Sequence, residues 1–180
     1  MRPENHAGWK LVDVSPAEDY EEFHPAGAVS VPSVRFQSSS TNVRDALRAV
    51  AFASLAVRPT EDVPEFGAAV AAAASGAKGV IVACAAGGTL RGTTNFPDGQ
   101  ASRSLMAARE LLRLEAVARG QLAVAHLQGG ISAWVAAGGA GEGTGEWSAR
   151  KGRVPSVGGA FPQAAMRKAM WSLVAQRCSF

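Results

Sequence analysis

The chain has 180 residues, a length that suits one domain with a tail better than two full domains. Its net charge of +3 lies toward one end: residues 1–139 carry 12 Lys and Arg against 13 Asp and Glu, whereas residues 140–180 carry 6 against 2. Because no basic face or nucleic-acid motif occurs in the first of these regions, we expect no nucleic-acid partner.

The chain alternates predicted strands with predicted helices. Strands are predicted at short β-branched apolar runs, and helices where apolar residues recur at helical spacing. In chain order we predict a strand at 10–14, a helix at 15–24, a strand at 28–31, helices at 43–57 and 61–74, a strand at 79–84, a helix at 102–117, a strand at 122–127 and a short helix at 130–138.

Two of these predictions have a specific local basis. Ser15, Pro16 and Glu18 have the spacing of a helix cap, a first-turn proline and a capping box. The run GVIVAC at 79–84 is unbroken and β-branched, as a strand buried on both faces should be. Alternating strands and helices predict an α/β fold, with a parallel sheet flanked by helices on both faces.

The chain is expected to divide into a short leader (1–8), one domain (9–139) and a C-terminal extension (140–180). Residues 139–146 have the Gly-rich composition of a linker, and residues 161–178 predict a basic amphipathic helix. Two interpretations of that helix stay open. It packs back on the domain, or it contacts an acidic protein or an anionic membrane surface.

The two cysteines, Cys84 and Cys178, are too few for a disulfide scaffold, and a reducing compartment is the default expectation. No apolar run approaches the ~20 residues of a transmembrane helix. The N-terminus is too short and polar for a signal peptide, and no transit peptide is visible.

Cys84 is the candidate for chemistry. It ends the most clearly predicted strand and precedes a loop and then a helix, the position where ligands bind in open α/β sheets. Backbone N–H groups of such a loop, together with the N-terminus of the next helix, stabilise a thiolate. A thiolate attacks sulfur and can carry it as a persulfide. The alternative is that Cys84 is a small buried core residue.

Three segments then show a family resemblance. Residues 11–16 (LVDVSP) with 24–32 (HPAGAVSVP) resemble the N-terminal signature of the rhodanese family, 80–84 (VIVAC) its active-site strand and cysteine, and 127–134 (LQGGISAW) its C-terminal signature. The segment from Gly87 to Leu105, including NFPDGQ at 95–100, is similar to a plant and algal plastid branch of the family.

The resemblance implies a parallel sheet of about five strands and transfer of sulfur from thiosulfate or a persulfide to a thiol or cyanide. It implies a small sulfur-containing substrate, no cofactor and a chloroplast location. Cys84 would be the catalytic residue. The residues expected to bind substrate are Ala85, Ala86, Gly87, Gly88 and Arg103.

Two departures from the family pattern concern the loop and the first strand. Residues 85–101 separate Cys84 from Arg103, where the family has about six residues, so the loop forms either a cradle with a flap or no cradle. Ser15 replaces the arginine that commonly follows the first-strand aspartate. Composition predicts that residues 88–99 are mobile and lid-like, lying over Cys84.

Supporting roles are expected for Asp13, His24 and Trp134. Asp13 is predicted to bond the turn near His24 or Arg103, His24 to belong to that turn, and Trp134 to anchor the core. Arg103 either contacts an anionic substrate or is a solvated helix residue.

Four other functions were weighed. The glycine-rich run after Cys84 lacks the lysine of a phosphate-binding loop, since Thr93 holds that place. Arg91 comes too late for a cysteine phosphatase. No metal site is expected, because Cys84, His126, His24 and Cys178 lack ligand spacing. The remaining alternative is a non-catalytic module that uses the same fold to bind a partner.

Overall fold

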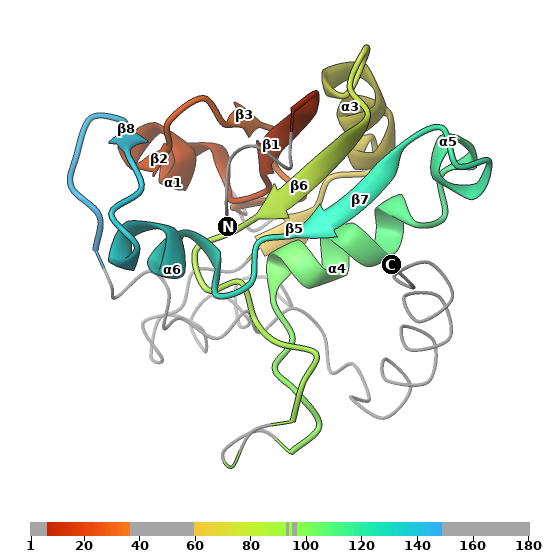
Figure 1. Ribbon diagram of the computed structural model, residues 1–180. Coiled ribbons are helices and arrows are strands. Elements are labelled where there is room, and N and C mark those ends of the chain that lie inside the picture. The colour runs from red at the N-terminus through yellow and green to blue at the C-terminus, as the bar shows by residue number, and fades with distance from the viewer. Residues whose placement is uncertain (1–6, 37–59, 93, 95–96, 149–180) are drawn as a thin grey trace, which may run out of the picture.

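A computed structural model describes residues 7–36, 60–92, 94 and 97–148. Its centre is a parallel sheet of four strands in the order β3-β1-β6-β7 (Figure 1). The strands are β1 (Trp9–Asp13), β3 (Val29–Ser30), β6 (Gly79–Ala83) and β7 (Ala123–His126). The parallel sheet and all four strand positions predicted from the sequence are therefore confirmed, although the described residues contribute four strands to this sheet and not five.

β6 organises the core because all five of its residues are buried. Its alternate side chains face opposite sides of the sheet. Val80 and Val82 belong to the larger apolar cluster, which includes Val70 and Leu111, whereas Ile81 belongs to a smaller cluster on the other side. Parallel strands covered on both faces are expected to read as continuous apolar runs, as β6 does.

Helices lie on both sides of this sheet. They are α1 (Ala17–Glu22), α3 (Phe66–Ala73), α4 (Arg103–Leu111), α5 (Glu115–Ala118) and α6 (Gly130–Ala136). α4 contacts β6, β7 and α3, and Trp134 of α6 packs against the smaller cluster with Ile81. Within the described ranges, no helix is long and apolar enough to cross a membrane.

Three helix predictions need correction. The N-cap position of α1 is Pro16 and has no side-chain cap bond, so the capping box predicted at Ser15 is wrong. Residues predicted to begin a helix at 61 form β5 (Thr60–Asp62), which pairs antiparallel with β4 (Val34–Phe36). The helix predicted at 102–117 is broken into α4 and α5. The predicted helices at 43–57 and 161–178 lie outside the described residues.

The first part of the predicted linker pairs with the domain. β8 (Gly141–Glu142) forms an antiparallel pair with β2 (His24–Pro25). The backbone N–H groups of Thr144 and Gly145 donate to the carbonyls of Glu21 and Glu22 in α1. These contacts attach residues 140–145 to α1 and β2, so the domain continues beyond 139.

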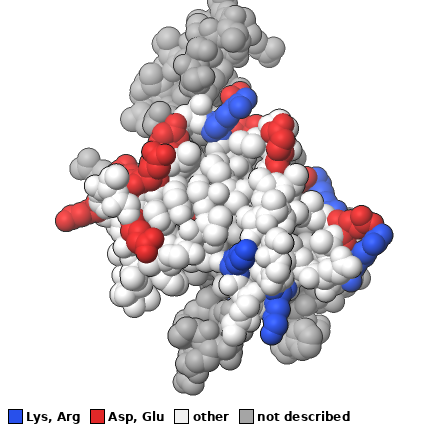
Figure 2. Space-filling model, turned by 90° about the horizontal axis from the view of Figure 1, so that it is seen from above, with Lys and Arg blue, Asp and Glu red and all other residues white. Residues whose placement is uncertain are grey.

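The described residues carry 8 Lys and Arg and 13 Asp and Glu, so they are net negative. On the face seen in Figure 2, acidic and basic side chains lie next to each other at places along the edge, and neutral residues cover most of the middle. The positive charge of the whole chain therefore comes from residues outside the described ranges.

Candidate functional site

Cys84 directly follows β6, at the carboxyl end of the central strand, and its side chain is only 3% exposed. Two groups of Ser104 contact its sulfur. The backbone N–H of Ser104 donates to Sγ at 3.4 Å, and the Ser104 hydroxyl lies 3.1 Å from Sγ. Ser104 is the second residue of α4, so the sulfur sits at the positive end of that helix.

α4 begins at this point because Ser102 caps it. The Ser102 hydroxyl accepts a hydrogen bond from the Leu105 N–H at 3.2 Å, the arrangement preferred at a helix N-cap. The same hydroxyl lies 3.2 Å from Oγ of Ser104. The cap therefore fixes both the start of α4 and the place of Ser104 beside the sulfur.

His126 is the third member of this cluster. Its Nε2 lies 3.0 Å from Oγ of Ser104, which links Cys84, Ser104 and His126 by hydrogen bonds. Burial lowers the pKa of His126 below its usual value, and a backbone hydrogen bond with Gly87 acts in the opposite direction. A lowered pKa makes the neutral imidazole the dominant form at neutral pH.

His126 was predicted neither as a metal ligand nor as a neighbour of Cys84. The signal was available in the strand predictions. β7 is the parallel neighbour of β6, and His126 is paired in register with Val82. A polar residue at the carboxyl end of the adjacent parallel strand is expected to lie close to a residue that follows β6.

The backbone around Cys84 is packed directly against the start of α6. The N–H of Ile131 donates to the Cys84 carbonyl at 3.0 Å, and the N–H and hydroxyl of Ser132 donate to the Ala85 carbonyl at 3.2 and 3.0 Å. Gly87 and Gly130 make this close approach possible, because a Cβ on Gly130 would lie 2.2 Å from the Cys84 carbonyl oxygen. Because Gly130 has no side chain, the start of α6 can pack against the backbone of the loop after Cys84.

The inserted segment after Gly88 is closed at its base. Thr89 and Gln100 form an antiparallel bridge with hydrogen bonds of 2.9 and 2.7 Å. The described residues between them run away from the sheet in Figure 1. Because the bridge joins its two ends, Gly88 and Ser102 come together despite the insertion, and Ser102 lies close to Gly88.

Asp13, at the end of β1, and Arg103, at the start of α4, are two further polar residues of the predicted site. The Arg103 Nη1 lies 3.7 Å from Asp19 Oδ2, with the Arg103 side chain 20% exposed, so Arg103 is paired with α1. Asp13 is fully buried and accepts a hydrogen bond from the Ser15 N–H at 2.9 Å. Burial raises the Asp13 pKa, against the lowering effects of Ser15 and His24.

Each of these two side chains keeps one buried atom free. Among the described residues, neither Asp13 Oδ2 nor Arg103 Nε has a hydrogen-bond partner. Asp13 therefore accepts a hydrogen bond from Ser15 in its own turn, and not from the turn near His24 or from Arg103 as predicted.

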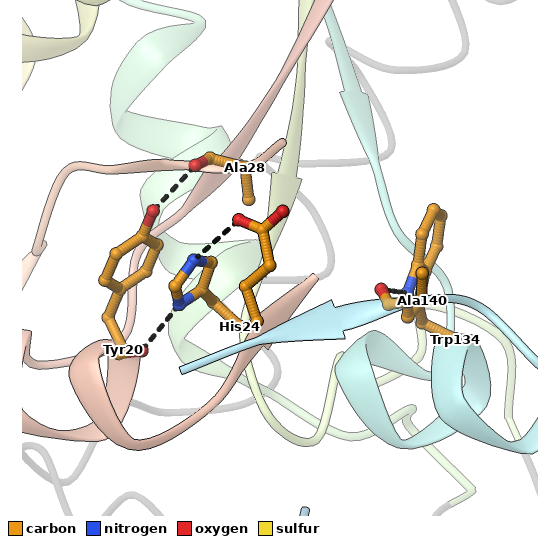
Figure 3. A network of polar contacts seen from close by, with 6 residues as sticks. Tyr20, His24, Ala28, Trp134 and Ala140 are labelled. Atoms are coloured by element: carbon orange, nitrogen blue, oxygen red, sulfur yellow. Dashed lines mark hydrogen bonds and ion pairs between the residues drawn. The ribbon is translucent and has the colours of Figure 1, made fainter. Parts of the chain in front are cut away.

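His24 and Trp134 lie in the scaffold beside β8 (Figure 3). The His24 ring stacks on Tyr20, with Nδ1 2.8 Å from the Tyr20 carbonyl and Nε2 3.6 Å from Glu142. Trp134 donates from Nε1 to the Ala140 carbonyl at 2.8 Å. Both residues thus attach the segment after 139 to the domain. In the part of the chain that the structure describes, no group of three or more His, Cys, Asp or Glu could hold a metal ion.

Comparison with known proteins identifies the class. The family described as "Rhodanese-like domain" matches residues 2–137, and the chain therefore belongs to the rhodanese-like domain family. It is 37% identical over 135 residues to "Rhodanese-like domain-containing protein 14, chloroplastic" of Arabidopsis thaliana. The match covers 74% of this chain and 58% of that protein, so the chain spans little more than half the length of this relative.

Two solved structures resemble the chain more distantly. A Bacillus halodurans protein is 20% identical, with a TM-score of 0.43 and coverage of 82% of this chain and 77% of the other. A thiosulfate sulfurtransferase of Pseudomonas aeruginosa is 21% identical, with a TM-score of 0.37 and coverage of 94% of this chain and 24% of the other.

Proposed function

We propose that this protein is a sulfurtransferase in which Cys84 carries a sulfane sulfur as a persulfide. The observation that carries the proposal is the position of the Cys84 sulfur at the N-terminus of α4, where the Ser104 N–H donates to it. A helix N-terminus and a directed N–H both favour negative charge on sulfur. The thiolate is the form of cysteine that attacks a sulfur donor.

The proposed reaction has two displacement steps. The Cys84 thiolate attacks the sulfane sulfur of thiosulfate or of a persulfide donor. A new S–S bond forms on Cys84, the donor S–S bond breaks, and sulfite or the donor thiolate leaves with the bonding electron pair. An acceptor thiolate or cyanide then attacks the outer sulfur, and Cys84 leaves as the thiolate. The two steps balance without any cofactor.

Substrate binding is proposed for Arg103 and the loop of Ala85, Ala86, Gly87 and Gly88. Arg103 is positively charged, lies one residue before Ser104, and has a buried Nε without a partner among the described residues. An anionic donor such as thiosulfate would offer oxygens to that N–H. Gly87 and Gly88 are buried, so the donor would approach beside Ala85 and Ala86.

A chloroplast location is proposed from the chloroplastic relative. The proposed contact of the basic C-terminal extension with an acidic protein or a membrane surface concerns residues beyond those that the structure describes.

The second candidate function is a non-catalytic binding module. The observation that favours it is the burial of Cys84, because a sulfur donor has to reach an atom whose residue is only 3% exposed. In this function the Cys84 thiol is a hydrogen-bonded core group and the domain surface binds a partner.

One experiment separates the two functions. The purified protein is incubated with thiosulfate, the Cys84 peptide is analysed by mass spectrometry, and cyanide is then added to release thiocyanate. We expect a gain of one sulfur on Cys84, complete loss of thiocyanate formation in Cys84→Ser, and normal turnover in the matched control Cys178→Ser. A folded wild-type protein that takes up no sulfur from either thiosulfate or a persulfide would establish the binding module instead.

A further inference from the structure

The oxygen of Ser104 determines the direction of the hydrogen bonds around Cys84. A serine hydroxyl donates one hydrogen bond and accepts two. Ser104 is fully buried, and its Oγ has three neighbours: Sγ of Cys84 at 3.1 Å, Oγ of Ser102 at 3.2 Å and Nε2 of His126 at 3.0 Å. Three contacts therefore use the full capacity of this hydroxyl, and one of the three has to be its donation.

We assign the donation to His126. Ser102 accepts from the Leu105 N–H, and its own hydroxyl hydrogen can donate to Ser104. The Cys84 thiol carries a hydrogen to donate as well. A neutral imidazole can accept at Nε2, and burial lowers the pKa of His126, which favours that neutral form. The order is then Cys84 S–H to Ser104 Oγ, and Ser104 O–H to His126 Nε2.

We propose that His126 is a positioning residue that takes the Cys84 proton through the Ser104 hydroxyl, which forms the thiolate inside a nearly closed site. The S–H bond breaks as an O–H bond forms on Ser104, and the original Ser104 O–H bond breaks as an N–H bond forms on Nε2 of His126. The products are a thiolate on Cys84 and an imidazolium on His126. No proton leaves the cluster.

The surroundings of His126 fit this role. β7 carries the ring, α4 packs on β7 and presents Ser104 to it, and β6 ends at Cys84. The charged residue nearest in α4, Arg103, is paired with Asp19. Within the described residues, Cys84 is thus the titratable group joined to His126 by hydrogen bonds. The inference rests on the proposed function only in that the thiolate is used for sulfur transfer. The test of thiolate formation needs no sulfur donor.

The test measures the rate at which iodoacetamide alkylates Cys84 between pH 5 and 9, read on the Cys84 peptide. We expect His126→Asn and Ser104→Ala each to lower the rate at pH 7 by about tenfold. The double variant should lose no more than either single variant, because both act in one path. Ser104→Thr, which keeps the hydroxyl, should restore the pH profile. Ser33→Ala, which removes a hydroxyl bonded to the Val14 carbonyl elsewhere, is the matched control.

A second measurement avoids variants of His126 and Ser104. The ring nitrogens of His126 are followed by NMR against pH in the wild type and in Cys84→Ser, and the wild-type ring should hold its proton to higher pH because the thiolate stabilises it. Identical titrations, or single-variant rates equal to wild type, would overturn the proposal. Intact coupling without sulfur uptake would instead refute the proposed function alone, and sulfur uptake without coupling would refute only the role of His126.

Discussion

Two sets of polar residues, one including the end of β1 and the other the residue that follows β6, differ in how completely their atoms are hydrogen-bonded. In the sulfur cluster of Cys84, Ser104 and His126, the central hydroxyl has a partner for each of its three bonds. In the carboxylate cluster of Asp13 and Arg103, each side chain keeps a buried atom without a partner among the described residues.

This difference in hydrogen bonding suits the two clusters to different roles in the proposed reaction. An unsatisfied buried polar group costs about 1–3 kcal/mol. The free Arg103 Nε–H is therefore suited to donate to an incoming anion, and the free Asp13 oxygen to accept from a water molecule. The satisfied sulfur cluster is suited to hold one geometry and to move a proton within it. One cluster therefore receives the substrate in the proposed reaction, and the other prepares the nucleophile.

The largest effect is expected at Gly130, because the sulfur cluster depends on a close approach of two backbone segments there. Gly130 has a φ of 61°, and a Cβ there would lie 2.2 Å from the Cys84 carbonyl oxygen. We expect Gly130→Ala to lower the free energy of unfolding by about 3 kcal/mol or more, from backbone strain and overpacking together. Urea denaturation measures this loss.

Gly138→Ala is the matched control for that variant. Gly138 has a φ of 77° but nothing within 4 Å of an added Cβ, so it tests the strain without the contact. We expect a loss of about 1 kcal/mol there. Equal losses in both variants would show that the packing of α6 against Cys84 contributes nothing, and would remove this distinction between the two clusters.

A smaller effect is expected at Asp13, and it depends on pH. Burial raises the Asp13 pKa above 3.8, so the protonated carboxyl favours the folded state, and this contribution is lost as the pH rises through the folded-state value. Asn keeps an acceptor for the Ser15 N–H and never ionises. From pH 4 to pH 7, the unfolding free energy of Asp13→Asn should therefore rise relative to that of the wild type.

The exposed Asp62→Asn serves as the control for the loss of one negative charge. If the unfolding free energies of Asp13→Asn and wild type differ by the same amount at pH 4 and pH 7, burial does not disfavour the charged form of Asp13. A strand-end carboxylate held by a cation outside the described residues would give that result.

The sequence predicted the sheet better than the site. GVIVA at 79–83 is apolar along its whole length, and such a run predicts a strand buried on both faces and places Cys84 at its end. The strand pair β2 and β8 was missed, because two-residue strands held by backbone bonds leave no periodic pattern in the sequence. The same is true of Thr60–Asp62, which precedes a helix and was included in it.

His126 was missed for a different reason. Cys84, Ser104 and His126 are each separated by about 20 residues, and only the parallel pairing of β6 with β7, with α4 packed on both, brings them together. Neither residue type nor spacing along the chain indicates that Ser104 lies between the other two. Contacts of this kind follow from the fold, whereas Cys84 was found because strand ends are general binding positions.

The smallest effect is expected from removing the inserted segment, whose two ends are joined at Thr89 and Gln100. Replacing residues 90–98 by a single Asn leaves Asn and Gly99 between Thr89 and Gln100, and Asn-Gly is the two-residue turn favoured in hairpins. The described part of this segment is exposed except for Gly99. The hydrogen bonds of the Thr89–Gln100 bridge remain, whereas those between Arg91 and the Thr89 hydroxyl are lost. We expect the free energy of unfolding to change by less than about 1 kcal/mol, since shortening a loop alters closure entropy only slowly. The Cys84 alkylation rate should stay within about twofold of wild type, because the Ser102 cap and Ser104 keep their positions.

Gln100→Pro is the contrasting variant. It removes the N–H that donates to the Thr89 carbonyl and so opens the base of the segment. The Cys84 alkylation rate should fall in this variant, although no residue is deleted. If excision unfolds the protein while Gln100→Pro is tolerated, the projecting segment itself, and not its base, supports the loop that holds the sulfur.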